Sequence, residues 1–487
     1  MLATVVLVVV LGYFVYRALA RPSNFPPGPV GLPVVGYLPF LEKDVHKHMT
    51  KLSDQYGDVY GLTFGSYRVV VLNSLTTIRD AFKEDAFSGR PDFPFFLLRT
   101  DNKKGVIFSD GQNWQIIRRF TLRNLRDFGL GKSSIEGLVH YEIEQLIKTL
   151  SSMDGAPMNL ANRFNLAVVN ALWTMTAGAR FSHDDPAAVA SIESINEAIQ
   201  SISASNPVEF IPFLSNFGPW KNVIEHRFKF LEPMFKLVAD AIGKHNAAHK
   251  AGDESDLIHT FIERINNNDD SNPSFDEENG PLNLKNLLID LYAAGTETTS
   301  TSLLWLVLLL ATHPEIQEKA QREIDTHVPR DQLPSMEHRP KLNYTEATIR
   351  ESMRYATIVP LGVFHSTLED TEFRGYIIPK GTIIFGNAYK IHHDPEHWEK
   401  PDEFYPEHFL DDDGHLTNPE AFIPFAIGKR ACLGESLAKM ELFLFAAALL
   451  QKFTFKFPAD RPRPTLEPNI STISSPKPFD VIVQLRE

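Results

Sequence analysis

Apolar residues recur at helical spacing over most of the chain and alternate at the period of a β-strand in only a few short runs. The helical spacing predicts helices that include residues 140–151, 284–312, 314–325, 342–355 and 434–451. The strand-like runs are residues 67–72, 376–378 and 481–485. We therefore predict a mainly α protein with small β-sheets.

The first residues have a different pattern, because residues 2–16 are apolar and uncharged and are followed by Arg17 and Arg21. Together with its flanks this run is long enough for a membrane helix. Basic residues after an apolar run favour a cytosolic location for the following chain. A cleaved signal peptide is the alternative, since Ala18-Leu19-Ala20 has small residues at the spacing of a cleavage site.

The rest of the chain has the composition of a single globular domain. Of its 487 residues, 43% are hydrophobic and 22% are charged, which allows a large core. Prolines between residues 25 and 29 make a stiff spacer after the apolar run. We predict a membrane anchor at residues 1–20, a proline-rich hinge at 21–37 and one catalytic domain at 38–487. The net charge of -13 argues against a general nucleic-acid binder.

Cys432 is the only cysteine, so no intramolecular disulfide forms and any sulfur chemistry belongs to this residue. It lies in residues 425–434 (FAIGKRACLG), just before a predicted helix, where backbone N–H groups and the helix dipole favour a thiolate. The glycines let the backbone approach a flat partner closely. Taken alone, a single cysteine is more often a small buried hydrophobic residue than a ligand.

The pattern Phe-x-x-Gly-x-Arg-x-Cys-x-Gly around Cys432 resembles the haem-binding signature of the cytochrome P450 family. The resemblance implies the P450 fold and a haem b (iron protoporphyrin IX) whose iron is bound by the Cys432 thiolate. It also implies that Phe425 and Gly434 contact the haem. A histidine-rich run at residues 392–397 lacks the HExxH spacing of a helical zinc site, so we assign no metal beyond the haem iron.

Glu351 and Arg354 are an acid and a base three residues apart on a predicted helix. On their own they would be an ordinary surface pair. They resemble the Glu-x-x-Arg pair of the family, which joins a third group to lock the fold around the haem. Many relatives have an arginine there, whereas this chain has His408, so we expect a weaker and pH-sensitive contact.

Residues 294–299 (AGTETT) place a glycine, an acid and hydroxyls within the most apolar predicted helix. A helix kink with threonine side chains bonded to the backbone would also explain them. In the family this stretch crosses the haem, and the resemblance implies that Thr298 and Glu297 are catalytic and supply protons during oxygen activation. The propionate partners implied by the resemblance are Trp114, Arg118, His365 and Arg430.

The resemblance implies a monooxygenase that inserts one oxygen atom from dioxygen into a lipophilic substrate, by hydroxylation or epoxidation. Electrons would come from NADPH through a separate NADPH-cytochrome P450 reductase, with cytochrome b5 as a further partner. Residues 120–137 resemble the microsomal family 2 type, arthropod forms included, which implies the endoplasmic reticulum membrane with the catalytic domain facing the cytosol. A sesquiterpenoid hormone epoxidase is one candidate within that group.

Two sets of residues follow from the same resemblance. The basic residues expected to dock an acidic reductase are Arg118, Arg119, Arg123, Arg126, Lys132, Lys429 and Lys439. The expected substrate wall consists of residues 93–98, 210–220, 358–363 and 470–473 with Asp290 and Ala294.

The sequence is compatible with two other functions. A haem protein that only transfers electrons or binds a gas would not need Glu297 and Thr298. A reductase-independent isomerase or dehydratase of oxygenated lipids keeps the fold and the thiolate but commonly lacks this acid and hydroxyl pair.

Overall fold

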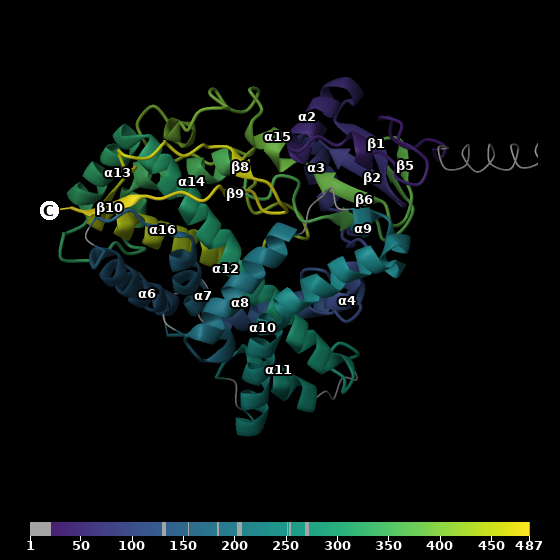
Figure 1. Ribbon diagram of the computed structural model, residues 1–487, viewed down its shortest axis with the longest axis horizontal. Coiled ribbons are helices and arrows are strands. Elements are labelled where there is room, and N and C mark those ends of the chain that lie inside the picture. The colour runs from purple at the N-terminus through teal and green to yellow at the C-terminus, as the bar shows by residue number, and fades with distance from the viewer. Residues whose placement is uncertain are drawn as a thin grey trace, which may run out of the picture.

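The computed structural model describes residues 21–128, 133–153, 155–182, 185–201, 207–250, 252, 255–267 and 272–486 (Figure 1). The predicted membrane anchor at residues 1–20 and the predicted docking residue Lys132 lie outside the described residues. In the part of the chain that is described, no helix has both the length and the apolar character needed to cross a bilayer.

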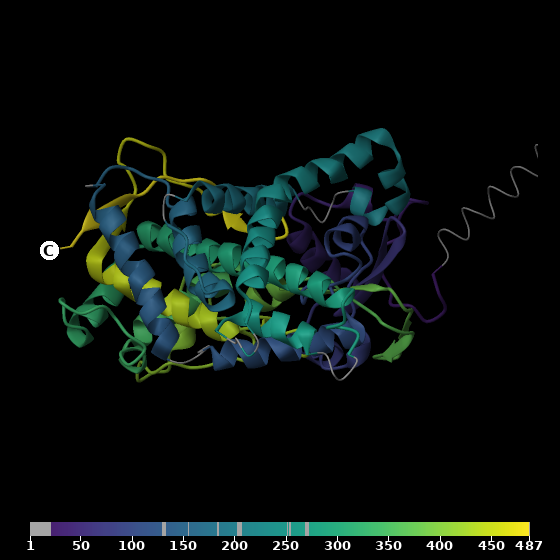
Figure 2. The same cartoon turned by 90° about the horizontal axis from the view of Figure 1, so that it is seen from below.

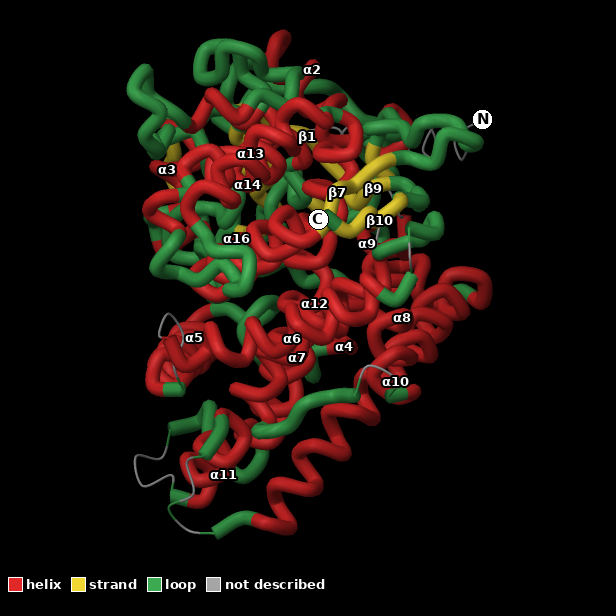
Figure 3. The backbone as a smooth tube through the Cα atoms, turned by 90° about the vertical axis from the view of Figure 1, so that its left-hand side faces the viewer, coloured by secondary structure: helices red, strands yellow, loops and turns green. Residues whose placement is uncertain are grey.

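Helices make up most of the molecule (Figure 3). The α-helices are α2 (Val45–Tyr56), α3 (Leu75–Phe82), α4 (Pro94–Arg99), α5 (Gly111–Asp127), α6 (Ser133–Ser151), α7 (Ala161–Ala177), α8 (Pro186–Ser201), α9 (Pro207–Phe210), α10 (Gly218–Ala248), α11 (Leu257–Asn266), α12 (Asn279–Thr312), α13 (Pro314–His327), α14 (Asn343–Ala356), α15 (Ala388–His392) and α16 (Glu435–Lys452). The 3-10 turns are η1 (Leu38–Phe40), η2 (Asp85–Phe87), η3 (Pro212–Asn216), η4 (Arg339–Lys341) and η5 (Pro406–Phe409). The mainly α class predicted from the sequence is confirmed.

Four small sheets contain the described strands. The main sheet has the order β1-β2-β6-β3, and the pairs β10-β7, β4-β5 and β8-β9 form the others. The strands are β1 (Val59–Phe64), β2 (Tyr67–Leu72), β3 (His365–Ser366), β4 (Thr371–Phe373), β5 (Tyr376–Ile378), β6 (Ile383–Gly386), β7 (Phe453–Lys456), β8 (Pro468–Asn469), β9 (Ser475–Pro476) and β10 (Ile482–Leu485). In the main sheet β2 pairs antiparallel with β1 and parallel with β6.

All five predicted helices are present, and the strands predicted at residues 67–72 and 376–378 agree with β2 and β5 at both ends. Helix α12 begins earlier than predicted. The Asp276 carboxylate accepts hydrogen bonds from the backbone N–H groups of Glu278 and Asn279, at 3.1 and 2.6 Å. These bonds fix the turn just before the helix, and the polar residues that follow it carry no apolar periodicity, which explains the difference.

The residues predicted to form a hinge lie against the main sheet. The Arg21 guanidinium donates to the carbonyls of Gly28 and Pro29, each at 2.6 Å. The backbone N–H of Gly61 in β1 donates to the Pro27 carbonyl at 2.7 Å. A Cβ added at Gly28 would lie 2.0 Å from the Gly61 carbonyl oxygen, so only glycine allows the segment to come this close.

Helix α12 passes through the centre of the helical region, where it packs against α7, α14 and α16 (Figures 1 and 2). A Cβ at Gly295 would lie 2.5 Å from the Leu172 Cδ2 atom of α7, so the Leu172 side chain occupies the space beside this glycine. The α12 side chains are buried around nearly the whole helix, which agrees with its uninterrupted apolar sequence. Polar residues in such a helix therefore need a specific explanation.

A fully buried ion pair joins α14 to the segment that contains η5. The Arg354 guanidinium donates to both Glu351 carboxylate oxygens at 2.7 Å and to the carbonyls of His392, Pro401 and Glu403. His408 Nδ1 lies 3.3 Å from both carboxylate oxygens of Glu351. The Lys400 backbone N–H donates to His408 Nε2 at 3.1 Å, so the proton of a neutral ring is on Nδ1, where it faces Glu351. His408 thus binds Glu351 without needing a charge.

We predict that Arg354→Met lowers the free energy of unfolding by about 3–5 kcal/mol, because it leaves the Glu351 carboxylate buried without its partner. Chemical denaturation of the haem-loaded protein measures this. Arg322→Met is the control, since Arg322 makes only an exposed pair with Glu318 and should change stability by less than about 0.5 kcal/mol. Equal effects of the two substitutions would contradict the structural role of Arg354.

Candidate functional site

The loop that carries Cys432 is fixed by backbone contacts with α3. The Lys429 N–H donates to the Phe82 carbonyl at 3.0 Å, and the Cys432 N–H donates to the Phe425 carbonyl at 2.9 Å. Gly428 has a φ of +81°, and a Cβ there would lie 2.2 Å from the Phe82 carbonyl oxygen. Glycine is required at this position both by its backbone conformation and by the contact. The loop ends at Gly434, which caps the N-terminus of α16.

The Cys432 side chain has solvent-accessible surface. Protein atoms nevertheless lie around most of its thiol group. Burial raises the pKa of this thiol, while hydrogen bonds from the Gly434 and Glu435 backbone N–H groups and the nearby Arg118 guanidinium lower it. Accessible area together with desolvation is expected for an atom that borders an internal space. A cation bound to the sulfur in that space would stabilise the thiolate.

Arg430 is buried beside the Cys432 loop with no described carboxylate in an ion pair with it. Its guanidinium donates to the carbonyls of Ser88 and Ser109, at 2.8 and 2.6 Å, and its Cζ atom lies 3.8 Å from the Trp114 ring centroid. Burial, with a smaller contribution from the neighbouring Arg90 guanidinium, lowers the pKa of Arg430 to about 7. A bound anion would offset this cost of burying a cation.

Trp114 and Arg118 come from α5 and lie on the same side of the cysteine loop. The Trp114 ring is buried, and its Nε1–H has no hydrogen-bond partner among the described residues. The Arg118 guanidinium donates to the Ala431 carbonyl at 2.5 Å and lies 6.0 Å from the Trp114 ring. A buried N–H donor without a partner, next to guanidinium groups, fits the carboxylates of a haem.

His365 lies close to this group on β3, stacked on Phe82 at 3.9 Å between ring centroids. Its Nδ1–H donates to the Phe87 carbonyl at 2.8 Å. Burial holds the pKa of His365 well below its ordinary value, and the Arg90 and Arg430 guanidinium groups contribute in the same direction. The ring is therefore neutral, with Nε2 unprotonated. It can donate a hydrogen bond to a propionate only if that anion stabilises the protonated, imidazolium form of the ring.

One face of α12 has accessible side chains although the helix is buried elsewhere. Ala294 is exposed and Thr298, one turn later, is half-buried. The Thr298 hydroxyl donates to the Ala294 carbonyl at 2.8 Å. Accessible side chains on one face of a central helix indicate that this face borders an internal space rather than packed protein.

Glu297 is buried next to this face. Its carboxylate accepts hydrogen bonds from the Thr301 hydroxyl at 3.3 Å and from the Asn165 side chain of α7 at 3.5 Å. Burial raises the pKa of Glu297 to about 7, an increase that these two hydrogen bonds partly offset. A carboxyl group that changes protonation near neutral pH has the chemistry of a proton carrier.

The expected substrate wall needs one correction. Asp290 is buried, and its carboxylate pairs with Arg99 at 2.9 Å and accepts the Val106 and Ile107 backbone N–H groups, each at 2.8 Å. Asp290 therefore fixes the segment before α5 and is not available to a substrate. In α4, by contrast, Leu98 is 61% exposed.

The histidine-rich run at residues 392–397 forms hydrogen bonds within the fold. The Ile423 backbone N–H donates to His392 Nε2 at 3.0 Å, and His392 Nδ1 lies 2.9 Å from the Thr357 hydroxyl. The His393 Nδ1–H donates to the Tyr389 carbonyl at 3.0 Å. These contacts give both rings a structural role.

A model of the cytochrome P450 family matches residues 26–483. The chain belongs to this family. Cytochrome P450 2L1 of Panulirus argus is 38% identical over 97% of both chains, and cytochrome P450 2D15 of Canis lupus familiaris is 36% identical over 97% of this chain and 95% of its own. Farnesoate epoxidase of Bombyx mori is 33% identical over 100% of this chain and 99% of its own. These relatives confirm the predicted similarity to family 2 and to arthropod forms.

As a cytochrome P450, the protein is a monooxygenase that binds haem b, uses a redox partner and acts on lipophilic substrates. The residues described above fit that cofactor. An accessible thiol, a buried indole N–H without a partner and buried guanidinium groups meet around one loop. Together they supply an iron ligand and donors for carboxylates.

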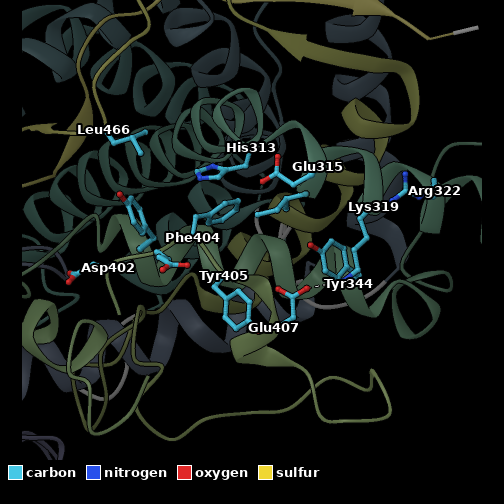
Figure 4. A pocket seen from close by; sticks show the side chains of 13 residues that line it. His313, Glu315, Lys319, Arg322, Tyr344, Asp402, Phe404, Tyr405, Glu407 and Leu466 are labelled. Atoms are coloured by element: carbon cyan, nitrogen blue, oxygen red, sulfur yellow. Dashed lines mark hydrogen bonds and ion pairs between the residues drawn. The ribbon is translucent and has the colours of Figure 1, made fainter. Parts of the chain in front are cut away.

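A surface cavity of about 730 Å³ lies elsewhere, between α13, α14 and the segment before η5 (Figure 4). His313, Phe404 and Tyr405 are among the residues that line it, and Lys319 pairs with Glu407 at its edge at 2.8 Å. None of the predicted haem or catalytic residues lines this cavity.

Sequence reasoning missed Glu441, which is buried in the middle of α16. Its carboxyl group forms a hydrogen bond with Thr299, the neighbour of Thr298, and its Oε1 atom has no partner among the described residues. Burial raises the pKa of Glu441 well above its ordinary value, which favours the protonated carboxyl group. A single acid within the apolar run 440–450 was the available signal.

We predict that Glu441→Gln reduces the loss of stability with rising pH. The pKa of Glu441 is higher in the folded state than its unfolded value of about 4.3. As the pH rises above that value, the unfolded state releases the proton while the folded state keeps it, so the free energy of unfolding falls. Unfolding temperatures between pH 5 and 8 measure this. Exposed Glu396→Gln is the control. If Glu441→Gln has the same pH slope as the wild type, the raised pKa assigned to Glu441 is wrong.

Proposed function

We propose that this cytochrome P450 inserts one atom of dioxygen into a lipophilic substrate, using electrons from NADPH delivered by a separate reductase. The observation that carries the proposal is the accessible face of α12, where Thr298 adjoins the titratable acid Glu297. A relative that only isomerises or dehydrates oxygenated lipids has no need for this pair. Residues 38–487 form the catalytic domain in this proposal.

The Cys432 thiolate is the proposed ligand of the haem iron, with Phe425 and Gly434 next to the haem. When bound, the haem supplies the centre that activates dioxygen. Trp114, Arg118 and Arg430 provide donors for the propionates, and His365 joins them only as an imidazolium. The buried guanidinium groups support this assignment, because their cost of burial falls when they face carboxylates.

Thr298 and Glu297 are the proposed proton-supplying residues. Glu297 has a pKa of about 7, so it exchanges protons readily at neutral pH, and Thr298 presents a hydroxyl at the accessible face. The Thr301 and Asn165 side chains hold the carboxyl group in place. The apolar surroundings limit the entry of bulk water to the site.

We further propose an apolar substrate of the sesquiterpenoid class. The similarity to a farnesoate epoxidase supports this class, as does the aromatic composition of α4 and its neighbours. Phe93 contacts both Phe96 and Phe210, with ring centroids 5.8 and 5.3 Å apart. Rings of this kind bind hydrocarbon chains without specifying polar groups.

Incubation with farnesoate, NADPH, reductase and ¹⁸O₂ tests the function. The expected product contains one ¹⁸O atom and forms only when NADPH and reductase are both present. Product that forms without NADPH and carries no label would support the isomerase or dehydratase alternative instead. A screen of other lipophilic compounds under the same conditions separates an incorrect substrate class from an incorrect reaction.

We predict that Thr298→Ala keeps haem and substrate binding but diverts NADPH into peroxide, because the hydroxyl that aids proton supply is lost. General acid–base contributions of about a hundredfold or more make the change in product per NADPH large. The matched control is Thr312→Ala, since the Thr312 hydroxyl makes the same kind of backbone bond, to Leu308 at 2.7 Å, at the end of the helix. Unchanged coupling in Thr298→Ala would refute its assignment.

The reductase is proposed to dock on α5 beside the cysteine loop, and cytochrome b5 is the proposed further partner. Arg119, Arg123 and Arg126 are exposed and share one helical face. No ion pair involves these three side chains within the described chain, whereas Lys429 and Lys439 pair with Asp85 and Glu435. Free cations on an acidic protein favour an acidic partner.

We predict that the double substitution Arg119→Glu, Arg123→Glu raises the KM for reductase about tenfold at low salt, while turnover supported by added peroxide is unchanged. Arg68→Glu is the control, because Arg68 is exposed on β2 in the main sheet. The difference between the two variants should shrink at high salt. A similar loss in both variants would contradict docking on α5.

Residues 1–20 are proposed to anchor the enzyme in the endoplasmic reticulum membrane, with residues 21–37 connecting to a catalytic domain that faces the cytosol. We predict that deletion of residues 1–20 leaves the haem in place and moves the protein out of the membrane fraction. Deletion of residues 1–24 should be less stable, because Asn24 donates to Gly375 at 2.6 Å and accepts from Ile377. Loss of haem on removing residues 1–20 would contradict the proposed boundary.

A further inference from the structure

Three metal-ligating side chains meet where α10 and α11 lie together, at the end of the molecule away from the sheets (Figures 1 and 3). The ligand atoms of His245, Asp256 and His259 all lie within 4.8 Å of one another. His245 is near the C-terminus of α10, Asp256 caps the N-terminus of α11 and His259 follows in its first turn. None of these residues belongs to the haem site.

The spacing of these atoms suits a tetrahedral ion. Asp256 Oδ2 lies 2.9 Å from His245 Nε2 and 3.1 Å from His259 Nδ1. Zinc bonds of about 2.0–2.2 Å at tetrahedral angles separate neighbouring ligand atoms by roughly 3.3–3.5 Å. The two contacts with Asp256 Oδ2 would therefore lengthen by a few tenths of an ångström around a bound ion. Two imidazole nitrogens and one carboxylate oxygen are also a ligand set that zinc prefers.

Contacts outside the cluster orient its ligands. The His245 Nδ1–H donates to the Ala241 carbonyl at 2.7 Å, because a carbonyl only accepts. His245 therefore presents Nε2 to Asp256, and that contact requires either a proton between the two atoms or a cation. Asp256 Oδ1 accepts the His259 backbone N–H at 2.9 Å, which leaves Oδ2 for the cluster. Metal-bound histidines and carboxylates are oriented by contacts of this kind.

The cluster is partly accessible to water. Asp256 is 4% exposed, whereas the His245 and His259 side chains are 11% and 12% exposed, so one side of the cluster reaches solvent. Gly178, which ends α7 with a φ of +58°, lies against the same carboxylate. A Cβ there would be 2.8 Å from Asp256 Oδ2, so the glycine preserves the space beside this oxygen.

We propose that His245, Asp256 and His259 form a binding site for Zn²⁺, completed by water. The bound cation replaces the proton that His245 otherwise needs in order to face Asp256. It links the end of α10 to the start of α11, because its ligands come from both elements. The site is independent of the haem and of the proposed reaction.

Calorimetric titration of Zn²⁺ into the full-length, haem-loaded protein after chelator treatment tests the proposal. The expected result is one zinc ion per chain and a higher unfolding temperature. His245→Gln and His259→Gln should weaken binding by more than the roughly 10–100-fold that outer contacts contribute. His226→Gln is the matched control, since His226 is exposed on the same helix. Mg²⁺, which prefers oxygen ligands, should give no comparable stabilisation.

X-ray absorption at the zinc edge of the wild-type protein keeps the test independent of how any variant folds. It should report nitrogen and oxygen neighbours with imidazole scattering and no sulfur. Failure of Zn²⁺ to bind, binding that is unchanged in both glutamine variants, or a sulfur neighbour from Cys432 would each overturn the proposal.

Discussion

The site depends on guanidinium groups that are buried around the cysteine loop and bonded to main-chain carbonyls. Arg430 ties this loop to Ser88 and Ser109, and Arg118 ties α5 to Ala431. Arg90 donates in turn to the carbonyls of Ile107 and Phe364. Burying several cations together is unfavourable unless an anion is near, and in the proposed site the carboxylates of the haem would supply that charge. The same contacts fix the position of Cys432.

The other half of the site comes from α12, which packs against the core on all of its faces except one. Gly295 allows α12 to approach α7, while Ala294 and Thr298 remain accessible on another face. Glu297 and Glu441 are both buried carboxyl groups beside this face, and burial raises the pKa of each. Helices α12 and α16 thus bring two protonatable carboxyl groups close to Thr298 among mostly apolar neighbours.

The sequence predicted the elements well, because α14 has apolar residues at helical spacing, α12 and α16 are long apolar runs, and β2 is rich in valine. The local motif identified Cys432 and Arg430, whereas the family resemblance pointed to Trp114, Arg118 and His365, which the structure also places near the cysteine loop. Contacts between distant segments were harder to predict. Asp290 was expected in the substrate wall but forms a buried ion pair with Arg99. The tautomer of His408 depends on a hydrogen bond from the backbone N–H of Lys400. The residues of the proposed zinc site, His245, Asp256 and His259, do not have the sequence spacing of a known zinc-binding motif.

The carbon monoxide spectrum of the reduced protein tests the central claim, that the Cys432 thiolate binds the haem iron, most directly. The wild type should show the far red-shifted Soret band of a thiolate-ligated haem. Cys432→Ser should lose that band or fail to bind haem, because a serine hydroxyl is not a soft anionic donor. A wild-type spectrum without the shift, or an unchanged spectrum in Cys432→Ser, would contradict the account.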